Sequence, residues 1–282
     1  MHAVVVDAEG VPRLAEVADP AGDGELVDVL ACGLCGSDVE KLGPAAAGLV
    51  LGHEVVGRTA DGRRVALVHH APCGECERCR AGHESTCERF RAPTILPGGF
   101  AERALATGGV VELPGAVGDA LGTYAEPLGC VLRALERVPR GDVIVVGGGF
   151  MGRLFAWTLR RRGDAVHVVD RDPARSDGPP PGAAAAVVLA APGGGDEALA
   201  LVKPSGALLV FADAGPLDLA RVYREEVTVA GSRSTTPRHL AEAVGLLPEL
   251  DLPEPLVLPL ERFADGLERY RRREALKVVF TP

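Results

Sequence analysis

Four cysteines lie close together in the sequence, at a spacing typical of a metal site. They form the pattern C-x2-C-x2-C-x7-C, at Cys73, Cys76, Cys79 and Cys87. Tetrahedral Zn²⁺ takes four thiolates, and two-residue spacers let neighbouring sulfurs converge on one ion. An iron–sulfur cluster is the alternative for such short steps, and an incidental or redox group of cysteines is another. The spacing favours a structural zinc lobe over about residues 73–87, with no open position for chemistry.

A second group of candidate metal ligands lies upstream and downstream of this lobe. The segments are CGLCGSD at 32–38, GHEVVG at 52–57 and EPLG at 126–129. A catalytic zinc needs three protein ligands and one open position for water or substrate. Cys35, His53 and a carboxylate would supply that set. Taken singly, each residue is more often a core residue than a ligand.

A glycine-rich turn follows an apolar run at 143–146. Its pattern is G-x-G-x-x-G, which includes the residues Gly147, Gly149, Phe150, Met151 and Gly152. A helical stretch at 150–162 and a second apolar run at 165–169 come next, and Asp170 ends that run. Asp170 lies where a carboxylate meets the ribose hydroxyls of a dinucleotide. The alternative is a glycine-rich turn in an α/β unit that binds no nucleotide.

Composition limits the partners of the chain. It has 282 residues, of which 47% are hydrophobic, and a formal net charge of −9. Phosphate binding needs clustered Lys and Arg, so we expect no nucleic-acid partner. The longest purely apolar run, at 183–191, is too short to cross a bilayer. No signal peptide is recognised at the start, and we expect a cytoplasmic protein with no membrane partner.

The three motifs, in this order, resemble the zinc-containing medium-chain alcohol dehydrogenase family. The EPLG form is similar to its polyol, sorbitol and threonine dehydrogenase branch. The resemblance implies an α/β protein with a GroES-like β-rich catalytic domain and a Rossmann-type parallel sheet. We expect the catalytic domain at 1–137 and 253–282, and the nucleotide domain at 138–252.

Compared with the family, the nucleotide domain is shortened. After Asp170 come only a proline-rich stretch at 178–182 and the apolar run at 183–191, which is similar to the family's fourth strand. The family has a helix, a strand and another helix in between. We therefore expect about five parallel strands, no strand outside the Asp170 strand and no helix through 176–182.

The resemblance also implies roles for individual residues. Cys35 and His53 would hold a catalytic zinc, with Glu126 or Glu54 as the carboxylate ligand. Ser37 occupies the position of the hydroxyl that relays the substrate proton. Asp38 would brace a ligand histidine. Where many relatives end the proton relay on a histidine, this chain has Glu40.

These expectations lead to a zinc- and NAD-dependent oxidoreductase. It would transfer hydride between NAD and a secondary alcohol or ketone of a polyol, sugar or cyclitol. Asp170 favours NAD, although Arg171 and Arg175 could accept the 2′-phosphate of NADP. We expect two zinc ions per chain and a homo-oligomer. The alternatives are a redox-neutral epimerase or lyase with bound NAD, and a non-catalytic dinucleotide-binding protein.

Overall fold

The chain forms two compact units, which are described separately. The computed structural model describes the backbone of residues 1–282 and all their side chains except that of Arg91. The first unit is Met1–Gly129 with Thr235–Pro282, and the second is Cys130–Ser234. The expected boundaries, near 137 and 252, are therefore later than those of the structure. The physical reason is Gly129, where a side chain would stand 2.4 Å from Thr235 Oγ1, so that residues after 234 pack closely against it.

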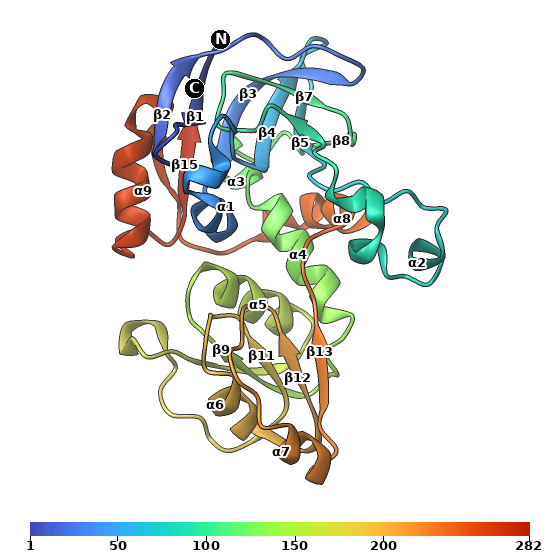
Figure 1. Cartoon of the computed structure of the whole chain (residues 1–282). Helices are drawn as coiled ribbons and strands as arrows, with labels where there is room; N and C mark the ends of the chain where they lie inside the picture. Colours follow the sequence, from blue (N-terminus) through green and yellow to red (C-terminus); the bar gives the residue numbers. More distant parts are fainter. The chain divides into compact units, whose positions relative to one another are not determined.

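The first unit is built on a curled sheet whose pairs are antiparallel except for one (Figure 1). Its order is β14-β15-β3-β4-β5-β8, and β7 branches from β3 and carries β6. Only β14 and β15 run parallel. The strands are β3 (Glu25–Gly33), β4 (Glu54–Thr59), β5 (Arg64–Leu67), β6 (Ile95–Leu96), β7 (Arg103–Ala106), β8 (Val110–Glu112), β14 (Leu256–Pro259) and β15 (Val278–Thr281). A separate hairpin pairs β1 (His2–Val6) with β2 (Pro12–Glu16).

The sheet positions the metal-ligand motifs through its register. Residues alternate between the two faces of a strand, and in β3 Val27, Val29 and Ala31 are buried in this period-two pattern. At the end of β3, Gly33 pairs with Glu54 at the start of β4. This register brings the CGLCGSD and GHEVVG segments side by side.

Short helices and an aromatic cluster complete the first unit. Phe100, Phe263 and Phe280 contact one another with ring centroids 4.6–5.6 Å apart. The helices are α1 (Gly36–Lys41), α2 (Glu77–Arg80), α3 (Asp119–Gly122), α4 (Ala125–Leu135, which continues into the second unit), α8 (Pro237–Leu246) and α9 (Phe263–Arg271). The 3-10 turns are η1 (Pro44–Ala46), η2 (Glu84–Thr86), η3 (Glu88–Arg91), η5 (Leu247–Glu249) and η6 (Leu260–Arg262).

The second unit is a five-stranded parallel sheet of order β10-β9-β11-β12-β13. The strands are β9 (Asp142–Val146), β10 (Ala165–Val169), β11 (Ala184–Leu189), β12 (Val202–Val210) and β13 (Thr228–Gly231). Helix α5 (Phe150–Arg161) contacts β9 and β10, and α6 (Gly195–Ala200) contacts β11 and β12. Continuous apolar runs such as Val143–Val145 are buried, as is usual where helices cover a parallel sheet. The remaining elements are η4 (Pro173–Arg175) and α7 (Leu219–Arg224).

The missing edge strand is confirmed. β10 ends the sheet, no further strand pairs with its outer side among the described residues, and residues 176–182 contain no helix. Strand β12 begins at Val202 and continues through an irregular pairing with β11, with Ser205 at φ 58°.

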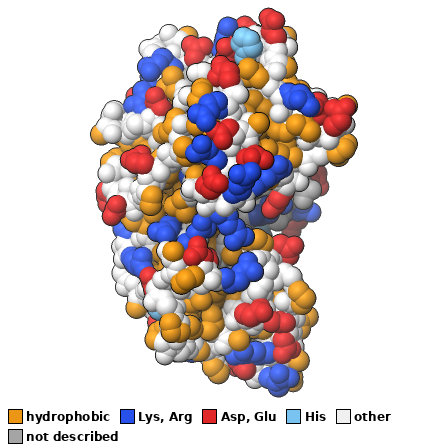
Figure 2. Space-filling view, turned by 90° about the vertical axis from the view of Figure 1, so that its left-hand side faces the viewer, with side chains coloured by type: hydrophobic (Ala, Val, Ile, Leu, Met, Phe, Trp, Pro, Cys, Tyr) orange, Lys and Arg blue, Asp and Glu red, His pale blue; other side chains and the backbone are white. Residues whose placement is uncertain are grey.

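Acidic, basic and apolar side chains are interspersed over the face of the molecule shown in Figure 2. Among the described residues, none of the helices combines the length and the apolar character that a membrane span requires.

Candidate metal centres and nucleotide site

The first candidate metal centre brings together Cys35, His53 and Glu54. Their ligand atoms all lie within 4.8 Å of one another, and His53 and Glu54 are buried. Cys35 precedes α1, His53 directly precedes β4 and Glu54 begins it, so the β3–β4 register creates the group. We call it the trio.

A buried carboxylate braces two members of the trio. Asp38 Oδ1 lies 3.0 Å from His53 Nδ1, and Asp38 Oδ2 accepts a 3.1 Å hydrogen bond from the Cys35 N–H. Although burial raises it, the pKa of Asp38 is lowered by the charge and hydrogen bond of His53. The pKa of His53 is raised well above its usual value by Asp38, against the effect of burial. With Nδ1 held by Asp38, the other ring nitrogen is available to a metal.

Glu54 has a second partner besides the trio. Lys277 Nζ forms a buried ion pair with Glu54 Oε2 and donates a 3.1 Å hydrogen bond to Leu34 O. Glu54 and Lys277 are only 1% and 3% exposed. The carboxylate fits there because residue 33 is Gly, where a Cβ would stand 2.0 Å from Glu54 Oε2.

Of the remaining residues that were predicted for this centre, one contacts the trio and two do not belong to it. Ser37 Oγ donates a 3.3 Å hydrogen bond to Cys35 Sγ, so it touches the trio directly. Glu40 is exposed on α1. Glu126 is buried in the first turn of α4 but does not belong to the trio, in which Glu54 is the carboxylate.

A row of rings lies beside the trio. The His53 ring stacks on His69 at 4.4 Å, His69 meets His70 at 3.8 Å, and His70 stacks on Phe90 at 4.4 Å. Burial lowers the pKa of His69 well below its usual value. Phe90 follows three residues after Cys87, and the row therefore connects the trio with the cysteine lobe.

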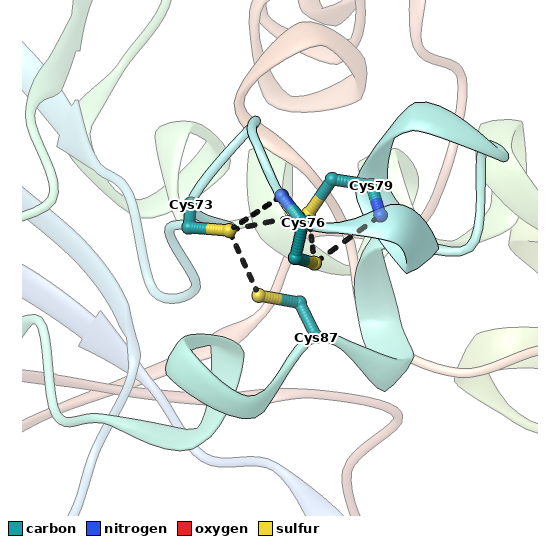
Figure 3. A group of neighbouring side chains, drawn as sticks. All are labelled: Cys73, Cys76, Cys79 and Cys87. Carbon is teal, nitrogen blue, oxygen red and sulfur yellow. Dashed lines mark hydrogen bonds between the residues drawn. The ribbon is translucent and has the colours of Figure 1, made fainter.

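The second candidate metal centre is the four-cysteine lobe. Figure 3 shows that the sulfurs of Cys73, Cys76, Cys79 and Cys87 point toward one another. Neighbouring sulfurs are 3.5–3.9 Å apart, and four thiolates around one zinc ion would be about 3.8 Å apart. The N–H groups of Cys76 and Cys79 donate to the sulfurs of Cys73 and Cys76. Such hydrogen bonds stabilise thiolates, the form that binds metal.

The glycine-rich turn connects β9 to α5. Gly147 has a φ of 107°, and a Cβ at Gly152 would stand 1.6 Å from Gly147 O, so a side chain is excluded there. Gly149 caps α5, and no atom lies within 4 Å of the position of its missing Cβ. Phe150 and Met151 begin α5. The turn therefore leaves backbone room for a phosphate at a helix N-terminus.

Asp170 directly follows β10 and lies beside this turn, as its position in the sequence indicates. Its Oδ2 accepts a 2.6 Å hydrogen bond from the Gly148 N–H, and its Oδ1 accepts a 2.8 Å bond from the Asp172 N–H. Arg171 is exposed, and Arg175 Nε lies 3.4 Å from Asp172 Oδ2.

Some residues of these sites were not predicted. The sequence assigned no role to Lys277 or to His69, and both reach the trio from distant segments. A pattern could have drawn attention to Lys277, because it is one of only three lysines and precedes the apolar run Val278–Phe280. Nothing comparable distinguishes His69.

The curled antiparallel sheet and the reduced parallel sheet together define a medium-chain dehydrogenase fold, as expected. The family described as "Alcohol dehydrogenase GroES-like domain" matches residues 22–115. D-Altritol 5-dehydrogenase of Agrobacterium fabrum is 32% identical over 200 residues, which cover 62% of this chain and 60% of that relative's length. L-Galactonate-5-dehydrogenase of Escherichia coli is 24% identical to this chain. The alignment covers 97% of this chain and 96% of that relative's length.

Among solved structures, alcohol dehydrogenase TADH from Thermus sp. ATN1 superposes with a TM-score of 0.85 at 25% identity, over all of both chains. These matches bear out the resemblance to the zinc-containing medium-chain alcohol dehydrogenase family and to its polyol dehydrogenase branch.

Proposed function

We propose that this chain is an oxidoreductase that transfers hydride between NAD and a secondary alcohol or ketone of a polyol, sugar or cyclitol. The proposal is carried by the trio. Its sulfur, imidazole and carboxylate ligand atoms lie within 4.8 Å of one another, and the buried Asp38 orients the imidazole. Two of the relatives support the substrate class, because they are dehydrogenases of altritol and galactonate.

The donor sets of both centres suit zinc. A zinc ion held by Cys35, His53 and Glu54 would supply Lewis acidity at the substrate oxygen, and a second ion in the lobe would be structural. Glu126 remains the alternative third ligand. The other residues act on protons and positions. Ser37 Oγ, which touches Cys35 Sγ, would take the substrate's hydroxyl proton and pass it toward solvent.

The nicotinamide cofactor would be held by the second unit. The glycine-rich turn suits a pyrophosphate, and Asp170 at the end of β10 favours NAD, because its charge repels a 2′-phosphate. Solved relatives of this fold are described in complex with NAD and with NADP. We propose that NAD is the preferred cofactor here.

The test is a panel of polyols, sugars and cyclitols assayed with NAD and NADP on zinc-loaded protein. We expect reduced nicotinamide to form with at least one secondary alcohol, faster with NAD. Cys35→Ser should abolish the activity and leave the lobe zinc bound. Zinc-loaded protein that reduces no cofactor with any substrate would contradict the proposal. Retained NAD without net reduction would instead favour a redox-neutral epimerase or lyase.

A further inference from the structure

The chain after Asp170 runs across the glycine-rich turn. We call residues Asp172–Gly178 the strap. The backbone of Arg175 lies directly against Gly148: a Cβ at Gly148 would stand 2.0 Å from Arg175 O and 2.9 Å from Arg175 C and Cβ. Residue 148 therefore must be small because the strap covers it.

The strap also engages the acid that is expected to meet the cofactor. Asp170 accepts one hydrogen bond from the Gly148 N–H, on the turn, and one from the Asp172 N–H, on the strap. Both carboxylate oxygens are thus directed toward the protein's own backbone. The Asp170 carboxylate and the strap together close the side of the turn on which a ribose would bind.

The other side of the turn is open. No atom lies within 4 Å of the position that a Cβ of Gly149 would occupy. The 12-residue helix α5 begins directly after this glycine. The phosphate-binding half of the site is therefore accessible, whereas the half that would meet the adenosine ribose is covered.

Polar contacts at the surface hold the strap to the outer edge of β10. The Asp177 N–H donates to Val168 O, and Asp177 Oδ2 accepts from the Val168 N–H, both at 2.9 Å. Gly178 O lies 3.1 Å from His167 Nε2, and Asp177 lies 3.3 Å from Arg160. No strap residue is buried. Exposed hydrogen bonds each contribute little net stability, and segments without apolar anchors open locally at low cost.

We propose that the strap is a displaceable cover which determines how much the adenosine half contributes to cofactor affinity. This proposal rests on the proposed function. In the closed arrangement the site recognises the nicotinamide mononucleotide half, and the adenosine half binds only when the strap leaves Gly148 and Asp170. The affinity for the dinucleotide is then reduced by the fraction of molecules in which the strap is open. The same hydrogen bonds shield the edge of β10 from other strands.

The test compares NADH with reduced nicotinamide mononucleotide, using nicotinamide fluorescence on the zinc-loaded protein. Asp177→Ala removes the side-chain contacts with Val168 and Arg160, and Ser176→Ala removes the hydroxyl hydrogen bonds to Val168 O and Gly178 O. We expect both variants to bind NADH about 5-fold more tightly than the unmodified chain, with mononucleotide affinity changed by less than about 2-fold. The control is Asp218→Ala, which removes two backbone hydrogen bonds at α7 and should change neither affinity.

A second readout is amide hydrogen exchange of the unmodified chain. NADH should speed exchange at the Asp177 N–H, and the mononucleotide should not. Unchanged NADH affinity in both variants, with both ligands bound, would overturn the strap proposal and leave the proposed function standing. Failure of every variant to bind either ligand would overturn the proposed function, and the strap proposal with it.

Discussion

At the residue scale, Asp38 has the largest predicted influence on the trio. Its carboxylate is 2% exposed and holds the His53 ring, the Cys35 N–H and, at 3.3 Å, the Gly52 N–H. Asp38→Asn keeps the volume but removes the charge and one acceptor. We expect zinc affinity at the trio to fall about 10–100-fold, with the lobe zinc unaffected.

Competition with a chelating dye measures this change. The matched control is Asp28→Asn on β3, whose side chain is 74% exposed, and it should bind zinc as the unmodified chain does. Unaltered trio affinity in Asp38→Asn would show that the His53 ring is positioned by its packing alone.

The Glu54–Lys277 pair leads to a second prediction at this scale. Removing one partner of a buried ion pair leaves an uncompensated charge, which costs about 3–5 kcal/mol. Lys277→Met should therefore lower the unfolding free energy of metal-free protein by about that amount. Glu54→Gln in the same background should recover most of it, because the buried charge is gone. Urea unfolding measures both. Equal stability of the single and double variants would refute the idea that the pair compensates Glu54.

At the scale of elements, the end of α5 is joined to its neighbours through Arg162 and Asp164. Asp164 is 2% exposed; it accepts from Arg162 Nε at 2.5 Å and from the Gly141 N–H at 2.9 Å. Arg162 also donates to Leu135 O and Val138 O. The two residues thereby connect the end of α5 with the segment between α4 and β9.

This connection should depend on pH. Burial raises the pKa of Asp164, but the hydrogen bonds from Arg162 and Gly141 outweigh it, and the pKa is lowered. A lowered pKa stabilises the fold above the unfolded-state value of about 3.9, and that stability is lost as the pH falls. We expect Asp164→Asn to cost about 1–3 kcal/mol at pH 7.

Urea titrations of the unmodified chain and Asp164→Asn from pH 7 to pH 3 test this expectation. The difference between them should shrink at the acid end. Glu197→Gln, at an exposed position of α6, should show no difference at any pH. A constant gap across the range would mean that Asp164 acts by its shape and not by its charge.

At the scale of the whole molecule, the two metal centres should release zinc separately. The trio would offer three ligands and leave one position open, whereas four thiolates would enclose an ion in the lobe. A purified chain should contain two zinc ions, and mild chelation should remove the trio zinc first with little change in Tm. Removal of the lobe zinc should then lower Tm by several degrees, since that binding energy is part of folding.

Metal analysis paired with calorimetry at each chelation step measures this order. Cys73→Ser should reproduce the late loss of Tm, and Cys35→Ser should not. Simultaneous loss of both ions would indicate that the ring row from His53 to Phe90 couples the two centres into one.

Local spacing was enough to predict several features. The four cysteines converge because two-residue spacers leave the chain few other arrangements. The glycine-rich turn and Asp170 were recognisable because a strand, a turn and a helix follow one another without interruption. The absent edge strand followed from chain length: the segment between Asp170 and the next apolar run is too short to form two helices and a strand.

Other features depend on contacts between residues far apart in the sequence, and only the tertiary structure decides them. Glu54 and not Glu126 joins the trio because the β3–β4 register places it beside Cys35. Lys277 reaches Leu34 across 243 residues of sequence. The strap covers Gly148 because its polar groups find partners along β10. Such pairings result from packing and register, and no spacing along the chain specifies them.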